Sequence, residues 1–503
     1  MNSDSDPGAP HAGPPRVIPR AEHPISRQHI ASNALRVLYR LREGGYQAFL
    51  VGGCLRDLML NVEPKDFDVA TSARPEEVKR LFRNCRLIGR RFRLAHVFFG
   101  RDIIEVATFR AASAPSQGEE PDDDPDILPE VGASEDPGAI DEQAGVDAEA
   151  VFGDSAFDED EPDDTDRLLN EGGRILRDNT YGTVEEDVWR RDFTCNALYY
   201  NIEDFSLWDY VGGMEDIAAR KLRLIGDPDQ RYREDPVRML RAARFEAKLG
   251  FTLDAATEAP IAQLRHLLTE VPAARLFDET LKLFLTGHGE KSLAVLRRRG
   301  LLQVLYPGVD RYLAQHPGSL VEQLLIAGLA NTDARVAAGK AVTPTFLFTL
   351  LLYGPIAAYI EKQPPERWGD VGTILEGCDV ALREAHQRVT IPKRFAFGVR
   401  DMFALQPQLE HPRGRRALRL LEQPRFRAAF DLLLLRAQVG MAPQDVAQWW
   451  TKLQEISPQQ RTEAIEALER AQGRQGAGSG SEGGGGSGRP RRRRRRRPPA
   501  ASP

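Results

Sequence analysis

The sequence predicts an α+β fold in which a small mixed-sheet head is followed by all-α subdomains. Short apolar runs of strand character are concentrated between residues 48 and 107, whereas apolar residues recur at helical spacing almost continuously from Pro236 to about Ala471. A chain of 503 residues is too long for one hydrophobic core. We therefore expect about two to four domains, with the sheet at the N-terminal end.

The elements of the head can be placed one after another along the chain. Helical periodicity starts near Ser26 and ends at Gly44-Gly45, and a second helix is predicted over 75–83. Strands are predicted over 48–51, 67–70, 97–99 and 103–107.

Three segments have compositions that do not support a folded core. Residues 1–16 are rich in Pro and Gly, and residues 111–173 hold 22 Asp and Glu against one basic residue. Residues 472–503 form a Gly/Ser linker that ends in Arg489 and Arg491–Arg497. We expect a disordered N-terminal tail, a disordered acidic insertion and a flexible cationic arm that binds RNA phosphates.

The net charge of −6 hides a basic folded part. Outside residues 111–173 the chain has 67 Lys and Arg against 52 Asp and Glu, a net charge of +15 that suits a polyanionic partner.

The cysteines and the hydropathy pattern point to the cytoplasm. Cys54, Cys85, Cys195 and Cys378 lie far apart and lack the C-x-x-C spacing, so we expect neither a disulfide framework nor a zinc site. No apolar run approaches the ~20 residues that cross a bilayer, and we expect no transmembrane segment.

A glycine turn followed by two spaced aspartates suggests a metal–phosphate site. Gly52-Gly53 follows the apolar run 48–51 and can bring bare N–H groups against an anion. Asp66 and Asp68 are two residues apart in a strand-like run, which places both carboxylates on one face. Mg²⁺ prefers such oxygen ligands together with substrate phosphates. An acidic surface turn would explain Asp-x-Asp alone, but the glycine turn favours the metal site.

A third carboxylate, Glu105, lies within the run Ile103–Val106. On a strand next to the two aspartates it would complete a site for two Mg²⁺ ions. An outward-facing strand residue is the simpler interpretation of Glu105 by itself.

Two polar motifs follow on the C-terminal side. If Asp192 begins a helix, Asn196 lies one turn along on the same face and the pair could hold sugar hydroxyls, while Arg191 reaches phosphate. Asp235 is a good N-cap before Pro236, and Arg238 could form paired hydrogen bonds to a base edge. A capped helix with a solvated basic face explains either motif alone.

In this order, the motifs resemble the class II nucleotidyltransferase superfamily of bacterial poly(A) polymerases and tRNA CCA-adding enzymes. The resemblance covers about residues 45–275 outside the insertion. It is carried by five blocks: Gly52-Gly53-x-x-Arg56-Asp57 with Asp66-x-Asp68, Ile104–Thr108, Arg191–Ala197, Asp209–Gly213, and Glu234-Asp235-Pro236-x-Arg238-x-Leu240-Arg241.

The resemblance implies roles for individual residues. Asp66, Asp68 and Glu105 would be catalytic and would hold two Mg²⁺ ions. The nucleotide-binding residues would be Gly52, Gly53, Arg56, Asp57, Arg191, Asp192, Asn196, Glu234, Asp235, Arg238 and Arg241. It also implies a nucleotidyltransferase head (17–201), a helical neck that recognises the base (202–275), a helical body with the RNA-binding domain (276–471) and the arginine-rich tail (472–503).

Within the superfamily, the blocks Leu87–Val97, Ile175–Gly182 and Arg231–Asp235 are similar to those of the poly(A) polymerase branch. The implied function is transfer of AMP from ATP to RNA 3′ ends without a template, promoting RNA processing and decay. RNA 3′ ends, ATP and the RNA-decay machinery are the expected partners of a monomeric chain. CCA addition to tRNA is the first alternative, and a catalytically inactive RNA-binding protein is the second.

Overall fold

The computed structural model describes residues 14–89, 93–111, 167–169, 175–178, 181–412, 416–457, 459–467 and 470. Backbone packing divides the chain into two compact units, Met1–Ala404 and Leu405–Pro503. The predicted cationic arm and nearly all of the N-terminal tail and acidic insertion lie outside the described residues.

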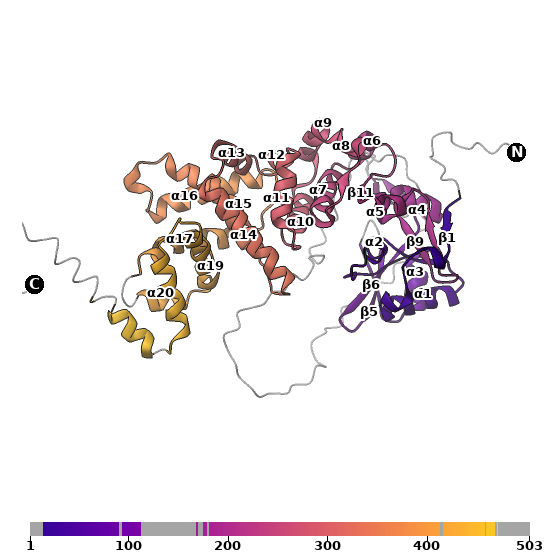
Figure 1. Ribbon diagram of the computed structural model, residues 1–503, viewed down its shortest axis with the longest axis horizontal. Helices are drawn as coiled ribbons and strands as arrows, with labels where there is room; N and C mark the ends of the chain where they lie inside the picture. The colour runs from indigo at the N-terminus through magenta and orange to yellow at the C-terminus, as the bar shows by residue number, and fades with distance from the viewer. Residues whose placement is uncertain are drawn as a thin grey trace, which may run out of the picture. The chain divides into compact units, whose positions relative to one another are not determined.

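The first unit opens with an eight-stranded mixed sheet in the order β1-β10-β9-β2-β3-β6-β5-β4 (Figure 1). Strands β3 and β6 run parallel and the other neighbours run antiparallel. The strands are β1 (Arg16–Ile18), β2 (Ala48–Val51), β3 (Asp68–Thr71), β4 (Cys85–Ile88), β5 (Leu94–Phe99), β6 (Asp102–Thr108), β9 (Leu198–Asn201) and β10 (Leu207–Asp209).

The register of the sheet brings the predicted carboxylates together. Asp68 pairs with Val51 on one side and with Glu105 on the other. Glu105 in turn pairs with His96. Because β3 and β6 are parallel neighbours, two residues 37 positions apart in the sequence stand side by side.

Both predicted helices of the head are present, the first with a later start, and the described residues add three helices that were not predicted. The first helix begins at Ser32 rather than near Ser26, because the Ser26 hydroxyl accepts a hydrogen bond from the Gln28 N–H and caps a short 3-10 turn instead. An additional helix starts directly at Gly53. The helices are α1 (Ser32–Glu43), α2 (Gly53–Met59), α3 (Pro75–Leu81), α4 (Val184–Arg190) and α5 (Gly213–Ala218).

Several strands lie outside the predicted ranges. The sheet continues past residue 201 because β10 pairs with β9. β7 (Arg167–Leu169) lies in the predicted acidic insertion and pairs with β8 (Ile175–Asp178), so this end of the insertion is not disordered as predicted. The acidic composition of the insertion as a whole concealed the short apolar segment Leu168-Leu169, which forms part of β7.

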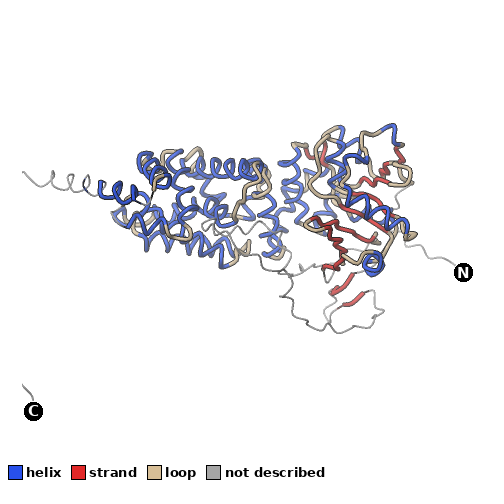
Figure 2. The backbone as a smooth tube through the Cα atoms, turned by 90° about the horizontal axis from the view of Figure 1, so that it is seen from below, coloured by secondary structure: helices blue, strands red, loops and turns tan. Residues whose placement is uncertain are grey.

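The rest of the first unit is helical apart from the short strands β11 (Lys221–Leu222) and β12 (Thr252–Leu253) (Figure 2). Its helices are α6 (Pro228–Glu234), α7 (Val237–Leu249), α8 (Ala255–Glu258), α9 (Ile261–Leu264), α10 (Ala273–Phe284), α11 (Gly289–Arg298), α12 (Leu302–Leu305), α13 (Pro307–Gln315), α14 (Leu320–Ala337), α15 (Pro344–Glu361) and α16 (Val371–His386).

Helix α15 corrects the expectation that no segment is long and apolar enough to cross a membrane. Its 18 residues meet that criterion by length and composition, but 56% of this segment is buried inside the protein. Leu347, Phe348 and Leu351 are almost fully buried. An interior helix that is apolar around its whole circumference gives the same sequence signal as a membrane span.

The second unit is also helical in its described part. Helix α17 (Lys393–Glu410) enters it and is followed by α18 (Arg416–Leu421), α19 (Phe426–Gln438) and α20 (Gln444–Glu455). Trp450 is fully buried against Phe426, and its indole N–H donates to the Leu409 carbonyl. These contacts form a separate core for this unit.

Candidate active site

A cavity of about 950 Å³ in the first unit gathers most of the predicted site residues. Head strands, the α2 turn and helices α7 and α10 all contribute to its wall. Its lining includes Gly52, Gly53, Arg56, Asp66, Asp68, Glu105, Arg191, Asp192, Asn196, Asp235, Arg238 and Arg241. Asp57 and Glu234 do not line the cavity. Each accepts a hydrogen bond from an arginine that does, Asp57 from Arg56 and Glu234 from Arg238.

The acidic end of the cavity is built on the sheet register. Asp68 is the first residue of β3, so Asp66 lies in the preceding loop rather than on the strand as predicted. Gly52 has a φ of +82°, and a Cβ there would stand 3.3 Å from the Asp68 Oδ2 atom. Glycine therefore permits both the left-handed backbone and the close approach to the carboxylate.

Burial and mutual repulsion raise the pKa values of these carboxyl groups. Burial, followed by the nearby Glu105, raises the pKa of Asp68 to about 6, although Arg191 opposes the shift. Burial and the nearby Asp66 raise the pKa of Glu105. A group of carboxylates that is costly to ionise is a suitable set of donors for a hard divalent cation.

The three carboxylates do not stand in a finished metal centre. Over the described ranges, no three His, Cys, Asp or Glu side chains are close enough together to hold an ion. Electrostatic repulsion keeps like charges apart, and a bound cation would remove that repulsion. The oxygen donors fit Mg²⁺ in type and line one cavity, and the metal assignment stays a prediction.

Replacing Asp68 with asparagine is expected to stabilise the metal-free protein near neutral pH. The folded carboxyl has a pKa of about 6 against an ordinary value of 3.8, so the folded state binds this proton more tightly than the unfolded state. The wild type therefore loses stability as the pH rises from about 4 through about 6. At pH values above that range the free energy of unfolding of the variant should exceed that of the wild type by about 1–3 kcal/mol, and below that range the two should be equal.

Urea unfolding in a chelator, at several pH values across that window, measures this difference. The exposed Asp229→Asn variant is the control and should show no comparable gain. A gain in Asp68→Asn that is the same at every pH would contradict the prediction.

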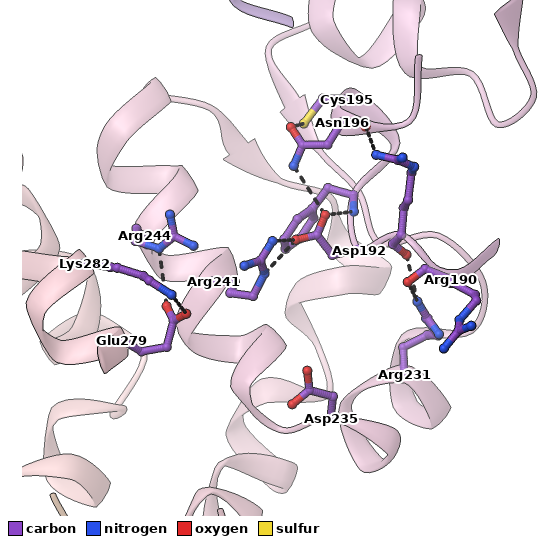
Figure 3. A network of polar contacts seen from close by, with 12 residues as sticks. Arg190, Asp192, Cys195, Asn196, Arg231, Asp235, Arg241, Arg244, Glu279 and Lys282 are labelled. Carbon is purple, nitrogen blue, oxygen red and sulfur yellow. Dashed lines mark hydrogen bonds and ion pairs between the residues drawn. The ribbon is translucent and has the colours of Figure 1, made fainter. Parts of the chain in front are cut away.

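A chain of hydrogen bonds links the glycine turn to α7. Figure 3 shows its part from Asn196 through Asp192 to Arg241. Arg56, whose side chain is only 3% exposed, donates from Nη1 to the Asn196 Oδ1 atom at 2.6 Å. The Asn196 amide donates to Asp192 at 3.3 Å, and Asp192 accepts from Arg241 Nε at 2.8 Å. Burial would raise the pKa of Asp192, but Arg241 holds it below its usual value, so Asp192 stays ionised.

The structure corrects the helix predicted to begin at Asp192. The segment Thr194–Asn196 is a single 3-10 turn, and the Asp192 Oδ1 atom accepts from the Phe193 N–H. Asp192 and Asn196 still meet as expected, because the turn shortens the path between them. Arg191 is held by Asp187 at 3.1 Å and by the Tyr199 hydroxyl at 2.7 Å.

The opposite end of the cavity is formed by the start of α7. Asp235 accepts from the Val237 N–H and from Arg275 Nη2 at 2.7 Å. Its carboxylate binds the first N–H of α7, but the N-cap position is occupied by Pro236 and not by Asp235 as predicted, because α7 begins one residue later. Arg238 donates to Glu234 at 3.0 Å and to the Arg231 carbonyl at 2.7 Å, which fixes its guanidinium at the cavity wall.

Sequence reasoning missed other residues that line the cavity. His96 lies 3.7 Å from Glu105, and Phe245 has the guanidinium groups of Arg56, Arg241 and Arg244 within 4.7–5.6 Å of its ring centre. Arg190, Lys248, Arg275 and Lys282 also contribute to the lining. Helical spacing from Arg244 could have found Lys248, but no local pattern pointed to Arg275 or Lys282 on α10.

Three family models match this chain. The head domain of poly(A) polymerase matches residues 48–223, a probable RNA- and SrmB-binding site of polymerase A matches 250–313, and the arginine-rich C-terminus of polymerase A matches 372–498. Together they cover the sheet from β2 onward and most of the helical part, but residues 224–249, which include α6 and α7, lie between the first two matches.

Similar proteins agree with these models. The chain is 43% identical to a poly(A) polymerase I of Salmonella typhi over 90% of its length and 89% of that protein. A CCA-adding enzyme of Bacillus velezensis is 31% identical over 56% of this chain and 57% of that protein.

The fold is similar to that of a crystal structure of a tRNA nucleotidyltransferase complexed with a primer tRNA and an incoming ATP analogue. The TM-score is 0.51 at 21% identity, over 83% of this chain and 98% of that one. The mixed-sheet head, the helical remainder and the full-length similarity agree. The chain belongs to the bacterial poly(A) polymerase family of the class II nucleotidyltransferases and is a polynucleotide adenylyltransferase.

Proposed function

We propose that this cavity binds ATP beside the 3′ end of an RNA in the cytoplasm and that two Mg²⁺ ions are held there by Asp66, Asp68 and Glu105. The observation that carries the proposal is the placement of these carboxylates and of the Asp235–Arg238 pair in one cavity lined by arginine and lysine. The carboxylates, with bound metal ions, suit the reacting phosphate. The Asp235 carboxylate and the Arg238 guanidinium suit the edge of a base.

The reaction joins the RNA 3′ oxygen to the α-phosphorus of ATP, breaks the bond to the pyrophosphate oxygen and releases the hydroxyl proton. When bound, the metal ions supply Lewis-acid chemistry that lowers the pKa of the 3′ hydroxyl and neutralises charge on the phosphates. Gly52 leaves room for a phosphate beside Asp68, and Arg191 presents a fixed guanidinium to it. Asp192 and Asn196 line the same cavity, and we assign them the task of orienting the ribose.

One reaction series tests this function against its alternatives. Purified protein is incubated with Mg²⁺, each NTP separately, and either a generic RNA or a tRNA that ends before CCA. Long A-tails on both RNAs support the proposal. A single C-C-A addition confined to the tRNA would instead assign CCA addition, and no incorporation at all would assign an inactive RNA-binding protein.

Arg238→Ala is expected to weaken the preference for ATP over CTP. Its side chain is 14% exposed and is oriented by Glu234 and the Arg231 carbonyl, so it can offer a paired contact to a base edge. Loss of that contact should remove about 1–3 kcal/mol of discrimination. The measurement is the ratio of kcat/KM for the two nucleotides.

The exposed Arg42→Ala variant on α1 is the control and should keep the wild-type ratio. An unchanged ratio in Arg238→Ala, together with normal ATP turnover, would assign Arg238 a structural role.

A further inference from the structure

Helix α7 carries four cations along one face. Arg238, Arg241, Arg244 and Lys248 are spaced by three, three and four residues, so they follow one another along the same side of the helix. All four line the cavity.

The three arginines are neutralised and the lysine is not. Arg238 pairs with Glu234, Arg241 with Asp192 and Arg244 with Glu279. Within the part of the chain that the structure describes, no carboxylate forms an ion pair with Lys248. A cation without a carboxylate partner keeps its charge available to a ligand.

Other basic side chains surround this lysine. Lys248 is exposed to solvent and lines the cavity, but partial desolvation lowers its pKa, and Arg56 and Arg244 lower it further while the Asp57 carboxylate opposes the shift. Lys65, which immediately precedes Asp66, lowers it as well. Burial lowers the pKa of His288, just before α11, and the charges of Lys248, Lys291 and Lys65 lower it further, although Asp333 opposes the shift. Basic groups therefore outnumber the acidic groups Asp57 and Asp333 around Lys248 and His288.

The charge continues from the cavity onto the outer surface. Lys248 lies seven residues after Arg241 on α7, a rise of about 10 Å away from the base-recognition end. Lys65 and Lys291 are exposed and do not belong to the cavity lining. Across the described ranges, neither of them forms an ion pair with a carboxylate.

We propose that Lys248, with Lys65 and Lys291 beside it, binds the phosphodiester groups of the RNA primer just upstream of its 3′ end. The inference rests on the proposed function, because it places the primer on the side of the metal-binding carboxylates that faces away from Arg238. An extended polyanion fits charges that lead out of the cavity, whereas a triphosphate is compact and has Gly52 and Arg191 to hold it.

The test measures RNA binding apart from catalysis. Full-length wild type, Lys248→Gln, Lys65→Gln and Lys248→Arg are titrated with an oligoadenylate of about six residues in a chelator without ATP, over a range of salt concentrations. Lys340→Gln, an exposed lysine away from the cavity, is the matched control. ATP binding with Mg²⁺ and without RNA is measured in parallel.

We expect Lys248→Gln to weaken oligoadenylate binding about 3–10-fold and to reduce the slope of log K against log salt by about 0.7, the value for one phosphate contact on a single strand. Lys65→Gln should act in the same direction, Lys248→Arg should retain binding, and ATP affinity and the Lys340→Gln control should not change. If Lys248→Gln binds oligoadenylate with the affinity and the salt dependence of wild type, the inference is overturned. Weaker ATP binding with normal oligoadenylate binding would overturn it too, in favour of the triphosphate.

Failure of the proposed function gives a different result. If wild type incorporates no AMP into any RNA, the function is wrong, whatever the titrations show. If wild type extends RNA while Lys248→Gln binds oligoadenylate like wild type, only the primer assignment is wrong.

Discussion

Asp68→Ala and Asp66→Ala are each expected to reduce AMP transfer to below a few per cent of wild type while the protein stays folded. Both carboxylates face the cavity beside Glu105, and removal of a metal ligand takes away the charge stabilisation on which phosphoryl transfer depends. The fold should not suffer, because the pKa of Asp68 is raised by its burial and its acidic neighbours. Glu105→Gln should behave in the same way.

Incorporation of labelled AMP into RNA at saturating ATP measures the loss, and thermal unfolding checks the fold. Asp102→Ala is the matched control, because Asp102 is an exposed carboxylate at the start of the same strand as Glu105. It should retain transfer. An Asp66 or Asp68 variant with more than a few per cent of wild-type activity would rule out the metal-site assignment.

Arg241→Ala is expected to damage both stability and activity. Arg241 pairs with Asp192, whose side chain is only 12% exposed, so the substitution leaves a buried carboxylate without its main partner. Such losses cost about 3 kcal/mol in the free energy of unfolding. The freed Asp192 would also disturb Asn196 and Arg56, and a small misplacement of that kind can lower kcat/KM for ATP on the order of 100-fold.

Chemical unfolding and steady-state kinetics measure the two effects. Arg233→Ala is the control, because Arg233 forms an exposed pair with Asp229 on α6 and its loss should cost much less stability. Equal losses from Arg241→Ala and Arg233→Ala would show that the Asp192 pair has no special importance. Arg241→Lys should recover part of the stability, since it keeps the charge but not the forked geometry.

Much of the head could be predicted because its signals are local. The strand 48–51 was predicted at its observed bounds, and the strands around Asp68 and Glu105 were found with small boundary errors. The short strands β1, β9 and β10 were missed, because runs of three or four residues carry too little periodicity to stand out. Their position in the sheet depends on pairing with distant strands.

The sequence alone determined which residue types are available and where they lie along each element. The close spacing of Asp66 and Asp68, the position of Asp235 just before α7 and the basic face of α7 are all local features of the sequence. Tertiary structure decided which of these groups meet. Arg56 reaches Asn196 across 140 residues, Asp192 reaches Arg241 across 49, and Arg275 reaches Asp235 across 40. Periodicity tells which face of an element a side chain occupies, but only the packing of elements determines which other face it meets. For that reason the arginines of α7, which pair with carboxylates, and Lys248, which forms no such ion pair within the described residues, look alike in the sequence and differ in the fold.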